Sequence, residues 1–95
     1  MDAPKTVHVR AVVHGRVQMV GFRAFVIHHA GDSGLSGTVR NLDDGTVEAV
    51  LEGPAQAVQR MLDLLHEGPS HARVERVDVE YGNPTGTLPA MMVAS

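Results

Sequence analysis

Apolar and polar residues alternate along four segments of the chain, which is the pattern of strands that have one buried face. These segments are residues 7–13, 38–42, 46–52 and 77–81. The second and third are separated by Asp43-Asp44-Gly45, and an Asp-Gly pair between two alternating segments is a strong signal for a hairpin. The pattern therefore predicts four strands, of which the second and third form a hairpin.

Two segments between these strands have apolar residues at helical spacing. The first runs from Phe22 to Ser33, and Gly34 follows where a left-handed residue commonly ends a helix. The second begins at Gly53-Pro54, because proline suits a first helical turn, and ends at Gly68-Pro69. Its apolar stripe consists of Val58, Met61, Leu62 and Leu65.

The predicted order is strand, helix, strand, strand, helix, strand. Two amphipathic helices and a mainly antiparallel sheet bury their apolar faces best when both helices pack on one side. This is the split βαβ arrangement, an α+β, ferredoxin-like fold with an antiparallel sheet and two helices on one face. Val74 is out of phase with the last alternating segment, which predicts a late start or a bulge, and residues 90–93 are predicted to add a short edge strand.

The size and composition are those of one globular domain. Of the 95 residues, 43% are hydrophobic and 20% are charged. We therefore predict a single domain over residues 1–95, with a core that extends from about residue 7 to residue 93.

Charge and composition also narrow the function. The formal net charge is -3, which argues against a broad nucleic-acid interface because such interfaces need a basic surface. The chain has no cysteine, which excludes disulfides, a thiolate zinc site and a cysteine nucleophile. We find no signal peptide and no apolar stretch of membrane-spanning length. These features predict a cytoplasmic protein that binds neither nucleic acid nor membranes, and the lack of a heptad seam or a long apolar edge strand favours a monomer.

The stretch from Val13 to Arg23 carries the clearest chemical signal. Gly15 and Gly21 bracket a short loop between the first predicted strand and the first predicted helix. Backbone N–H groups of such a loop and of the first helical turn point the same way, and the helix dipole adds positive charge there. Arg23 would bring a guanidinium group to the same place. The stretch is therefore a candidate phosphate-binding loop.

Two motifs in this chain resemble those of the acylphosphatase family, and the similarity extends over roughly residues 7–81. The first family motif is Gly, any residue, Val-Gln-Gly-Val, any residue, Phe-Arg. It is matched by Gly15, Val17, Gln18, Val20, Phe22 and Arg23. The second is Gly, an aromatic residue, Val, a basic residue and Asn, then three residues, Gly, any residue and Val. It is matched by Gly37, Val39, Arg40, Asn41, Gly45 and Val47.

The resemblance implies the ferredoxin-like fold and the hydrolysis of the carboxyl-phosphate bond of a small acyl phosphate to a carboxylate and inorganic phosphate. It implies neither a metal nor another cofactor, and no covalent intermediate. Arg23 and Asn41 would be the catalytic residues: Arg23 would hold the phosphate and Asn41 would position the attacking water. The loop residues that would bind the phosphate with Arg23 are Gly15, Arg16, Val17, Gln18, Met19 and Val20.

Two residues depart from the family motifs. Met19 stands where the family usually has glycine, and Thr38 replaces the usual aromatic residue. If position 19 requires a positive φ, a methionine there costs about 1 to 2 kcal/mol of strain or shifts the loop.

Three alternatives compete with this hypothesis. A non-catalytic phosphate-binding or anion-binding regulatory module on the same fold would use the loop without turnover. The chain could also be a domain of a larger maturation protein that uses carbamoyl phosphate, which the lack of a flanking linker disfavours. A metal site is disfavoured because the adjacent His28 and His29 lack the i, i+4 spacing that binds zinc, and Asp43-Asp44 is explained by the hairpin.

Overall fold

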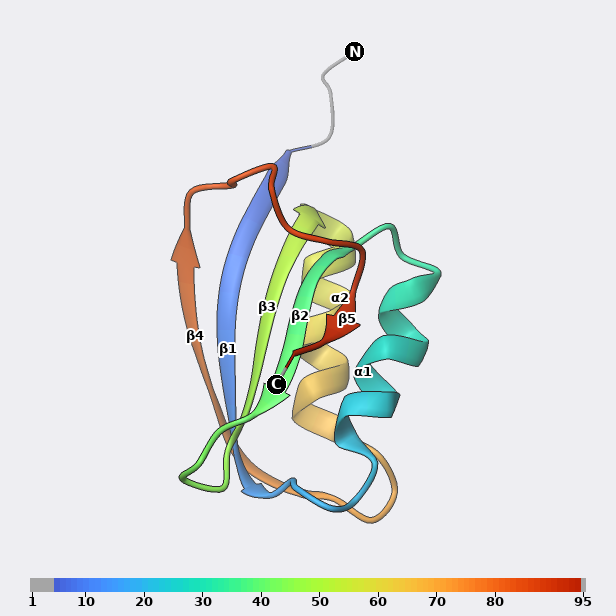
Figure 1. The fold of residues 1–95 in the computed structure, drawn as a ribbon, viewed down its shortest axis with the longest axis vertical. Coiled ribbons are helices and arrows are strands. Elements are labelled where there is room, and N and C mark those ends of the chain that lie inside the picture. The colour runs from blue at the N-terminus through green and yellow to red at the C-terminus, as the bar shows by residue number, and fades with distance from the viewer. Residues whose placement is uncertain (1–4, 95) are drawn as a thin grey trace.

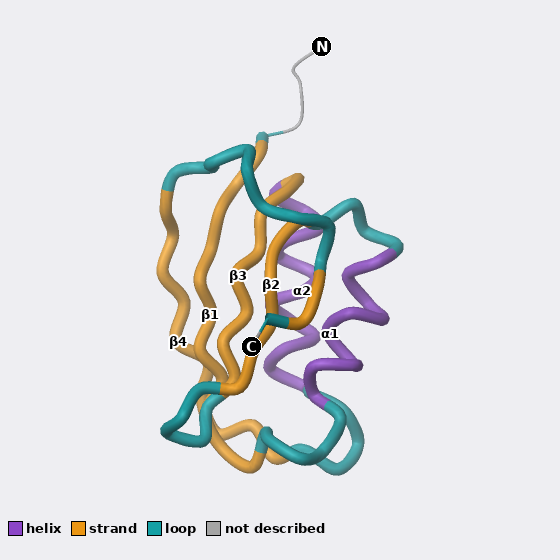
Figure 2. Tube along the Cα trace, viewed as in Figure 1, coloured by secondary structure: helices purple, strands orange, loops and turns teal. Residues whose placement is uncertain are grey.

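The computed structural model describes residues 5–94 and contains the predicted elements in the predicted order, followed by a short fifth strand (Figure 1). The elements are β1 (Thr6–Arg16), α1 (Phe22–Gly31), β2 (Ser36–Asn41), β3 (Val47–Pro54), α2 (Ala55–Glu67), β4 (Arg73–Gly82) and β5 (Met92–Val93). The described strands form one sheet, and both helices cover the same face of it (Figure 2). The predicted ferredoxin-like α+β fold is confirmed.

The sheet has the strand order β4-β1-β3-β2-β5. β1 pairs antiparallel with β3 and β4, and β2 pairs antiparallel with β3. β5, in contrast, pairs parallel with β2, so the sheet is mainly antiparallel, as predicted, with one parallel pair at its edge. The segment 83–91 crosses one end of the sheet before β5 begins, and β5 therefore runs in the direction of β2 (Figure 1).

β3 determines how its two neighbours are placed relative to one another. Because β3 is antiparallel to both, β1 and β2 run in the same direction and end at the same edge of the sheet. Val47 of β3 pairs with Val13 on one side and with Asn41 on the other. Directly paired residues have side chains on the same face, and Val13 and Val47 are fully buried. Asn41 therefore belongs to the helix-covered face, at the edge where β1 ends.

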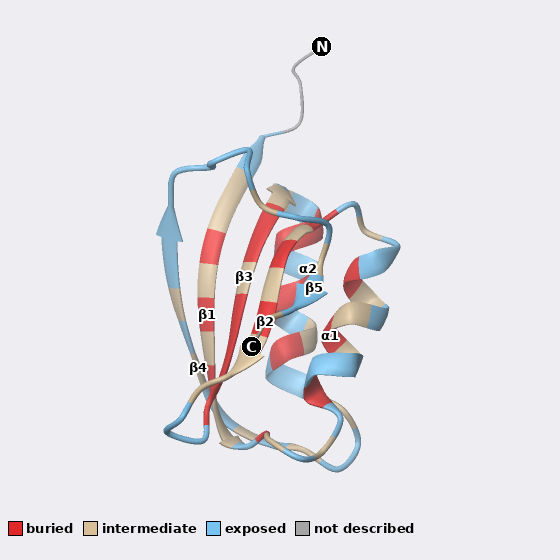
Figure 3. Cartoon of the chain, viewed as in Figure 1, coloured by how far each residue is buried: buried red, intermediate tan, exposed pale blue. Residues whose placement is uncertain are grey.

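The hydrophobic core lies between the sheet and the helices, where the buried residues of Figure 3 face one another. The apolar stripe predicted for the second helix, Val58, Met61, Leu62 and Leu65, is buried throughout. From α1 the core receives Phe22, Val26 and Ala30. The alternation in β1 is confirmed by Val9, Ala11 and Val13, which are all fully buried.

Each helix differs from the prediction at one end. α1 ends at Gly31 and not at Ser33, whose hydroxyl group donates to the carbonyl oxygen of His29 at 3.0 Å and satisfies a group at the helix end. Gly34 has a positive φ of 71°, as expected, but it lies in the turn beyond the helix. Pro54 has an extended ψ of 138° and precedes α2 instead of forming part of its first turn.

The bulge predicted from the phase of Val74 is present where β1 meets β4. The pairing of the two strands shifts between His14 and Gly15. A β-carbon on Gly15, whose φ is 129°, would lie 2.1 Å from the carbonyl oxygen of Arg73. Only glycine fits this close approach, which fixes the path of the chain immediately before the candidate loop.

We expect Gly15→Ala to lower the free energy of unfolding by about 2 kcal/mol or more, because the new methyl group overlaps the backbone of β4 and the positive φ is strained. Gly34 also has a positive φ, but a β-carbon there meets no atom within 4 Å. Gly34→Ala should therefore cost only about 1 kcal/mol. Urea unfolding measures the loss of unfolding free energy in both variants, and equal losses would contradict the close approach of β4 to Gly15.

The buried carboxylate of Glu52 anchors the segment that leads to β5. It accepts hydrogen bonds of 2.8 Å from the backbone N–H groups of Thr85 and Gly86, and it contacts Nδ1 of His8 at 2.8 Å. The hydrogen bonds from Thr85, His8 and Gly86, in that order of effect, lower the pKa of Glu52 to about 2. These hydrogen bonds hold the segment 83–91 against the sheet, and so they fix where the chain begins to run toward β2.

A pKa lowered by folding predicts how stability depends on pH. The stabilisation from the Glu52 carboxylate is present above the usual glutamate pKa of 4.5 and is lost as the pH falls toward about 2. Glu52→Gln should therefore reduce the free energy of unfolding at neutral pH, and the gap to wild type should shrink across that acid range. Glu80→Gln on the exposed edge of β4 is the control and should show a smaller gap. Urea unfolding at a series of pH values tests this, and a Glu52→Gln gap that does not change with pH would rule it out.

Candidate active site

The loop between β1 and α1, residues 17–21, is anchored at both ends. Val17 is buried in the core. Gly21, with a φ of 80°, is the N-cap residue of α1, and its carbonyl oxygen accepts a hydrogen bond of 3.0 Å from the N–H of Phe25. Among the described residues no side chain caps α1, and its first turn holds no acidic residue. The amides at this end of α1 are therefore open to an anion.

Gln18 connects this loop to the β2–β3 hairpin. Its Nε2 atom donates to the carbonyl oxygen of Leu42 at 2.8 Å and to that of Thr46 at 2.9 Å. An amide nitrogen carries two hydrogens, so both donors of the side chain are used by the hairpin. The side chain of Gln18 therefore positions the loop against the strand that carries Asn41.

An open pocket of about 390 Å³ lies where this loop, α1 and β2 meet. It is lined by Val17, Met19, Gly21, Phe22, Arg23, Ala24, Asn41 and Val93. The two predicted catalytic residues, Arg23 and Asn41, thus share one pocket although they come from different elements. The register of β3 explains this, because it aligns Asn41 with the end of β1 from which the loop departs.

The polar side chains of the pocket suit an anionic ligand. Of the described residues that line it, Arg23 is the charged one and Asn41 supplies an amide. Arg23 is exposed, and within residues 5–94 its guanidinium group forms no ion pair with a carboxylate. An uncompensated arginine next to the N-terminus of a helix gives the pocket a local positive potential on a chain whose net charge is -3.

Only part of the predicted phosphate-binding set lines the pocket, namely Val17, Met19 and Arg23. The other four are Gly15, Arg16, Gln18 and Val20. The first two are held in β1 by pairing with β4, the side chain of Gln18 reaches the hairpin, and Val20 packs against the core. The prediction also omitted four residues that line the pocket, namely Gly21, Phe22, Ala24 and Val93. Gly21 and Phe22 could have been predicted, because they lie in the stretch that carries the first motif. Nothing in the sequence near Val93 indicated that it lines this pocket.

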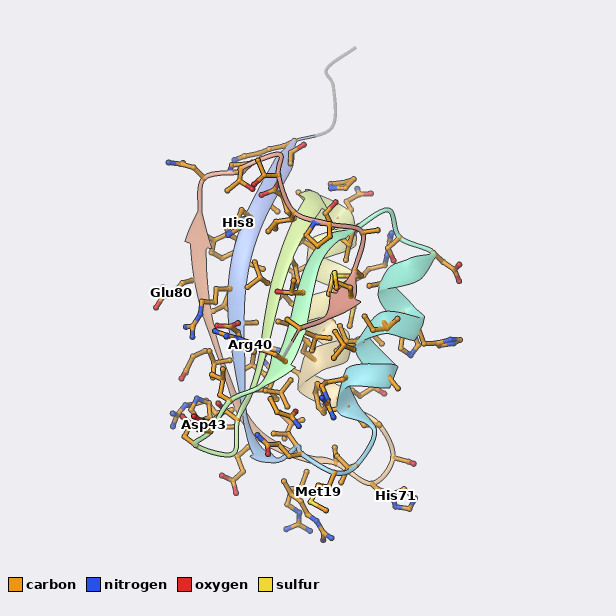
Figure 4. The ribbon with its side chains drawn as sticks, in the orientation of Figure 1. His8, Met19, Arg40, Asp43, His71 and Glu80 are labelled. Carbon is orange, nitrogen blue, oxygen red and sulfur yellow. The ribbon has the colours of Figure 1, made fainter. Side chains whose placement is uncertain are left out.

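Met19 has a φ of 64°, the one positive value at a non-glycine residue in the described chain. The strain foreseen for a methionine at this position, about 1 to 2 kcal/mol, is therefore present. The side chain is also 100% exposed, and it projects clear of the ribbon at one end of the molecule (Figure 4). Neither the strain nor the exposure of Met19 is offset by packing within the described fold.

Arg40, the basic residue of the second motif, lies outside the pocket. It precedes Asn41 in β2, and successive strand residues face opposite sides of a sheet. On the uncovered face its Nε atom donates to Glu48 at 2.8 Å, and Glu48 also accepts from Arg10 at 2.7 Å. Burial raises the pKa of Glu48, but the two arginines outweigh it and the pKa is lowered. Arg40 therefore neutralises a carboxylate on the opposite face.

Residues 5–94 contain no group of three or more His, Asp or Glu side chains placed to hold a metal ion. No helix in that range is long and apolar enough to cross a membrane.

A sequence profile of the acylphosphatase family matches residues 9–88. The chain belongs to the acylphosphatase family. It is 57% identical over 74 residues to the acylphosphatase of Roseiflexus sp., with 78% of this chain and 80% of that protein covered. The crystal structure of acylphosphatase from Bacillus subtilis superposes with a TM-score of 0.89 at 34% identity, covering 94% of this chain and 99% of that one.

Membership in the acylphosphatase family confirms the predicted enzyme class. The protein is a hydrolase of acyl phosphates, which are small-molecule substrates. The non-catalytic alternative finds no support in these relatives.

Acylphosphatase-like regions also occur inside larger proteins. HypF from T. kodakarensis matches this acylphosphatase with a TM-score of 0.76 and 34% identity, covering 94% of this chain and 12% of that one. The independent single domain over residues 1–95 therefore stays a prediction for the present chain.

The contacts of Gln18 predict that its removal affects both stability and rate. Gln18→Ala should lower the free energy of unfolding by about 1 to 3 kcal/mol, because two hydrogen bonds are lost. It should also slow acyl phosphate hydrolysis by about tenfold or more, because the loop is no longer fixed relative to Asn41. Gln59→Ala is the matched control, since within residues 5–94 the side chain of Gln59 bonds to Asp63 alone, on the exposed face of α2. An unchanged rate in Gln18→Ala would show that the link does not position the site.

Proposed function

We propose that Arg23 and the backbone amides of the β1–α1 loop hold the phosphoryl group of an acyl phosphate while Asn41 positions the attacking water. The observation that carries this proposal is the shared pocket of Arg23 and Asn41 at the N-terminus of α1. Arg23 provides a planar fork of donors, which matches phosphoryl oxygens better than a point charge does. The amides of the loop and of the first helical turn add neutral donors directed at the same anion.

The reaction transfers the phosphoryl group from a carboxylate to water. The water oxygen forms a bond to phosphorus, the bond from phosphorus to the acyl oxygen breaks, and its electron pair leaves with the carboxylate. The proton of the water passes to the phosphate or the solvent. Because the transition state is loose and spreads charge over the phosphoryl oxygens, positioning and charge stabilisation are the main needs.

The nature of the leaving group explains why the site needs no general acid. A carboxylate is already a stable anion, so no acid is needed to protonate it as it leaves. This agrees with a pocket lining that has an arginine and an asparagine but no Asp, Glu or His among the described residues. A phosphomonoester would leave as an alkoxide and would need such an acid.

Asn41 suits the positioning of water because its amide offers both a donor and an acceptor. Within the described residues its side chain forms no hydrogen bond to the protein, so both groups are available. The pairing with Val47 directs it to the helix-covered face, where the pocket lies. A water held by Asn41 would therefore approach a phosphoryl group held by Arg23.

We also propose that the enzyme acts as a cytoplasmic monomer and binds no nucleic acid. The absence of cysteine supports the cytoplasmic location and the net charge of -3 argues against nucleic-acid binding, while the sequence has no heptad seam or long apolar edge strand that would favour an oligomer. The mechanism proposed here needs no metal or cofactor, since Arg23 supplies the charge that a metal would otherwise provide.

Hydrolysis of benzoyl phosphate in the presence of EDTA tests the assigned roles. Arg23→Ala and Asn41→Ala should each lower kcat/KM by about 10² to 10³, the usual loss for one preorganised transition-state donor. Arg23→Lys should be similarly impaired, because lysine cannot replace the fork. Arg60→Ala, an exposed arginine on α2, is the control and should match wild type.

Two results would overturn the proposal. Equal rates in wild type, Arg23→Ala and Asn41→Ala would leave the non-catalytic binding module as the better description. Loss of wild-type activity in EDTA would instead show that the reaction depends on a metal.

A further inference from the structure

Beyond the phosphate, we propose that Met19 contacts the acyl group of the substrate and gives this enzyme a preference for acyl phosphates with a large apolar acyl group. The inference rests on the proposed function, because it assumes that the phosphoryl group lies between Arg23 and Asn41. It adds the substrate class that the same pocket would favour.

The pocket has two kinds of wall. Arg23 and Asn41 supply the polar part, while the larger apolar lining residues are Val17, Phe22, Met19 and Val93. Val17 and Phe22 are only 1% and 2% exposed, so their side chains belong to the core. Met19 and Val93 are 100% and 44% exposed, so they are accessible to a ligand. The larger accessible apolar side chains of the pocket are therefore those of Met19 and Val93, with the small exposed Ala24 beside them.

The substrate is divided in the same way. Its phosphoryl end requires charge and donors, whereas its acyl end is the part that leaves. A pocket of about 390 Å³ falls in the lower part of the range for small-molecule sites and has room for an acyl group beside a phosphoryl group. With the phosphoryl group at Arg23, an acyl group that extends toward solvent meets the exposed side chains of Met19 and Val93.

The conformation of Met19 supports a role for its side chain. A non-glycine residue with a φ of 64° and a fully exposed apolar side chain is unfavourable on both counts, and the described fold offers it no packing partner. Non-glycine residues with a positive φ are concentrated at functional sites, and a ligand bound in the pocket would give the Met19 side chain the contact that the fold does not provide. Methionine is flexible and polarizable, so it can adapt to aromatic and aliphatic groups alike.

Val93 reaches the pocket from the far end of the chain. β5 pairs parallel with β2 through Val39 and Val93, and the N–H of Ala94 donates to the carbonyl oxygen of Val39 at 2.9 Å. These bonds hold Val93 beside the strand that carries Asn41. A second apolar contact for the acyl group is therefore held in place by the sheet, whereas Met19 is carried by the loop.

The test compares two substrates, benzoyl phosphate and acetyl phosphate, which share the phosphoryl group and differ in the acyl group. Met19→Gln and Met19→Leu form a matched pair, because both keep a β-carbon at the strained position and only glutamine is polar. Met19→Gln should lower the ratio of kcat/KM for benzoyl phosphate to that for acetyl phosphate by about tenfold, and Met19→Leu should keep the ratio within about twofold of wild type. The change should appear mainly in KM for benzoyl phosphate, since this contact does not involve the reacting atoms.

Further variants define the surface and the controls. Val93→Thr, which is nearly isosteric, should lower the same ratio but by less than Met19→Gln. Met92→Gln is the control, because Met92 is 49% exposed but does not line the pocket, and its ratio should match wild type.

The possible failures are distinguishable. If wild type hydrolyses neither substrate, or does so without dependence on Arg23, the proposed function itself fails. If hydrolysis depends on Arg23 but the substrate ratio is the same in wild type, Met19→Gln and Met19→Leu, the acyl contact alone is wrong.

Discussion

The antiparallel pairing of β3 with both β1 and β2 is the constraint on which the rest of this structure depends. It makes β1 and β2 run in the same direction, so the loop after β1 and the residue at the end of β2 meet at one edge of the sheet. Val47 aligns Val13 and Asn41 in a single row beneath the helices. Slipping the β2–β3 pairing by one residue would turn Asn41 to the opposite face. The hydrogen bonds from Gln18 to the hairpin then join the loop to this same frame.

The two faces of the sheet consequently have separate tasks. The helix-covered face holds the core and, at its edge, the pocket with Asn41. The uncovered face carries charged residues that neutralise one another, as in the contacts of Glu48 with Arg10 and Arg40. Neighbours in sequence therefore differ entirely in their surroundings: Arg40 balances a carboxylate on the uncovered face, while Asn41 lines the pocket. The positive charge in the pocket lining is that of Arg23, which lies next to the N-terminal amides of α1.

The C-terminal segment, which follows the βαββαβ elements in the chain, also contributes to the lining of the pocket. Its crossing is held by Glu52, and its last described strand lies along β2 so that Val93 reaches the lining. Met19 lines the same pocket from the loop. Its positive φ is strained and its side chain is exposed, and no packing within the described fold offsets either. The polar lining residues Arg23 and Asn41 thus come from matched motif positions, whereas Met19 departs from the motif and Val93 lies outside both motifs.

The sequence by itself determined which segments are strands and helices and which faces they bury, because alternation and helical spacing reflect local geometry. Turn residues indicated the hairpin at Asp43-Asp44-Gly45, and the phase of the apolar residues indicated the bulge near Val74. The two motifs indicated Arg23 and Asn41 as candidate site residues. Only the tertiary structure decided that Gln18 bonds to the hairpin, that β5 runs parallel to β2 and that Val93 enters the pocket. Those contacts join residues far apart in the chain. They depend on strand order and register, which the preferences of neighbouring residues do not specify.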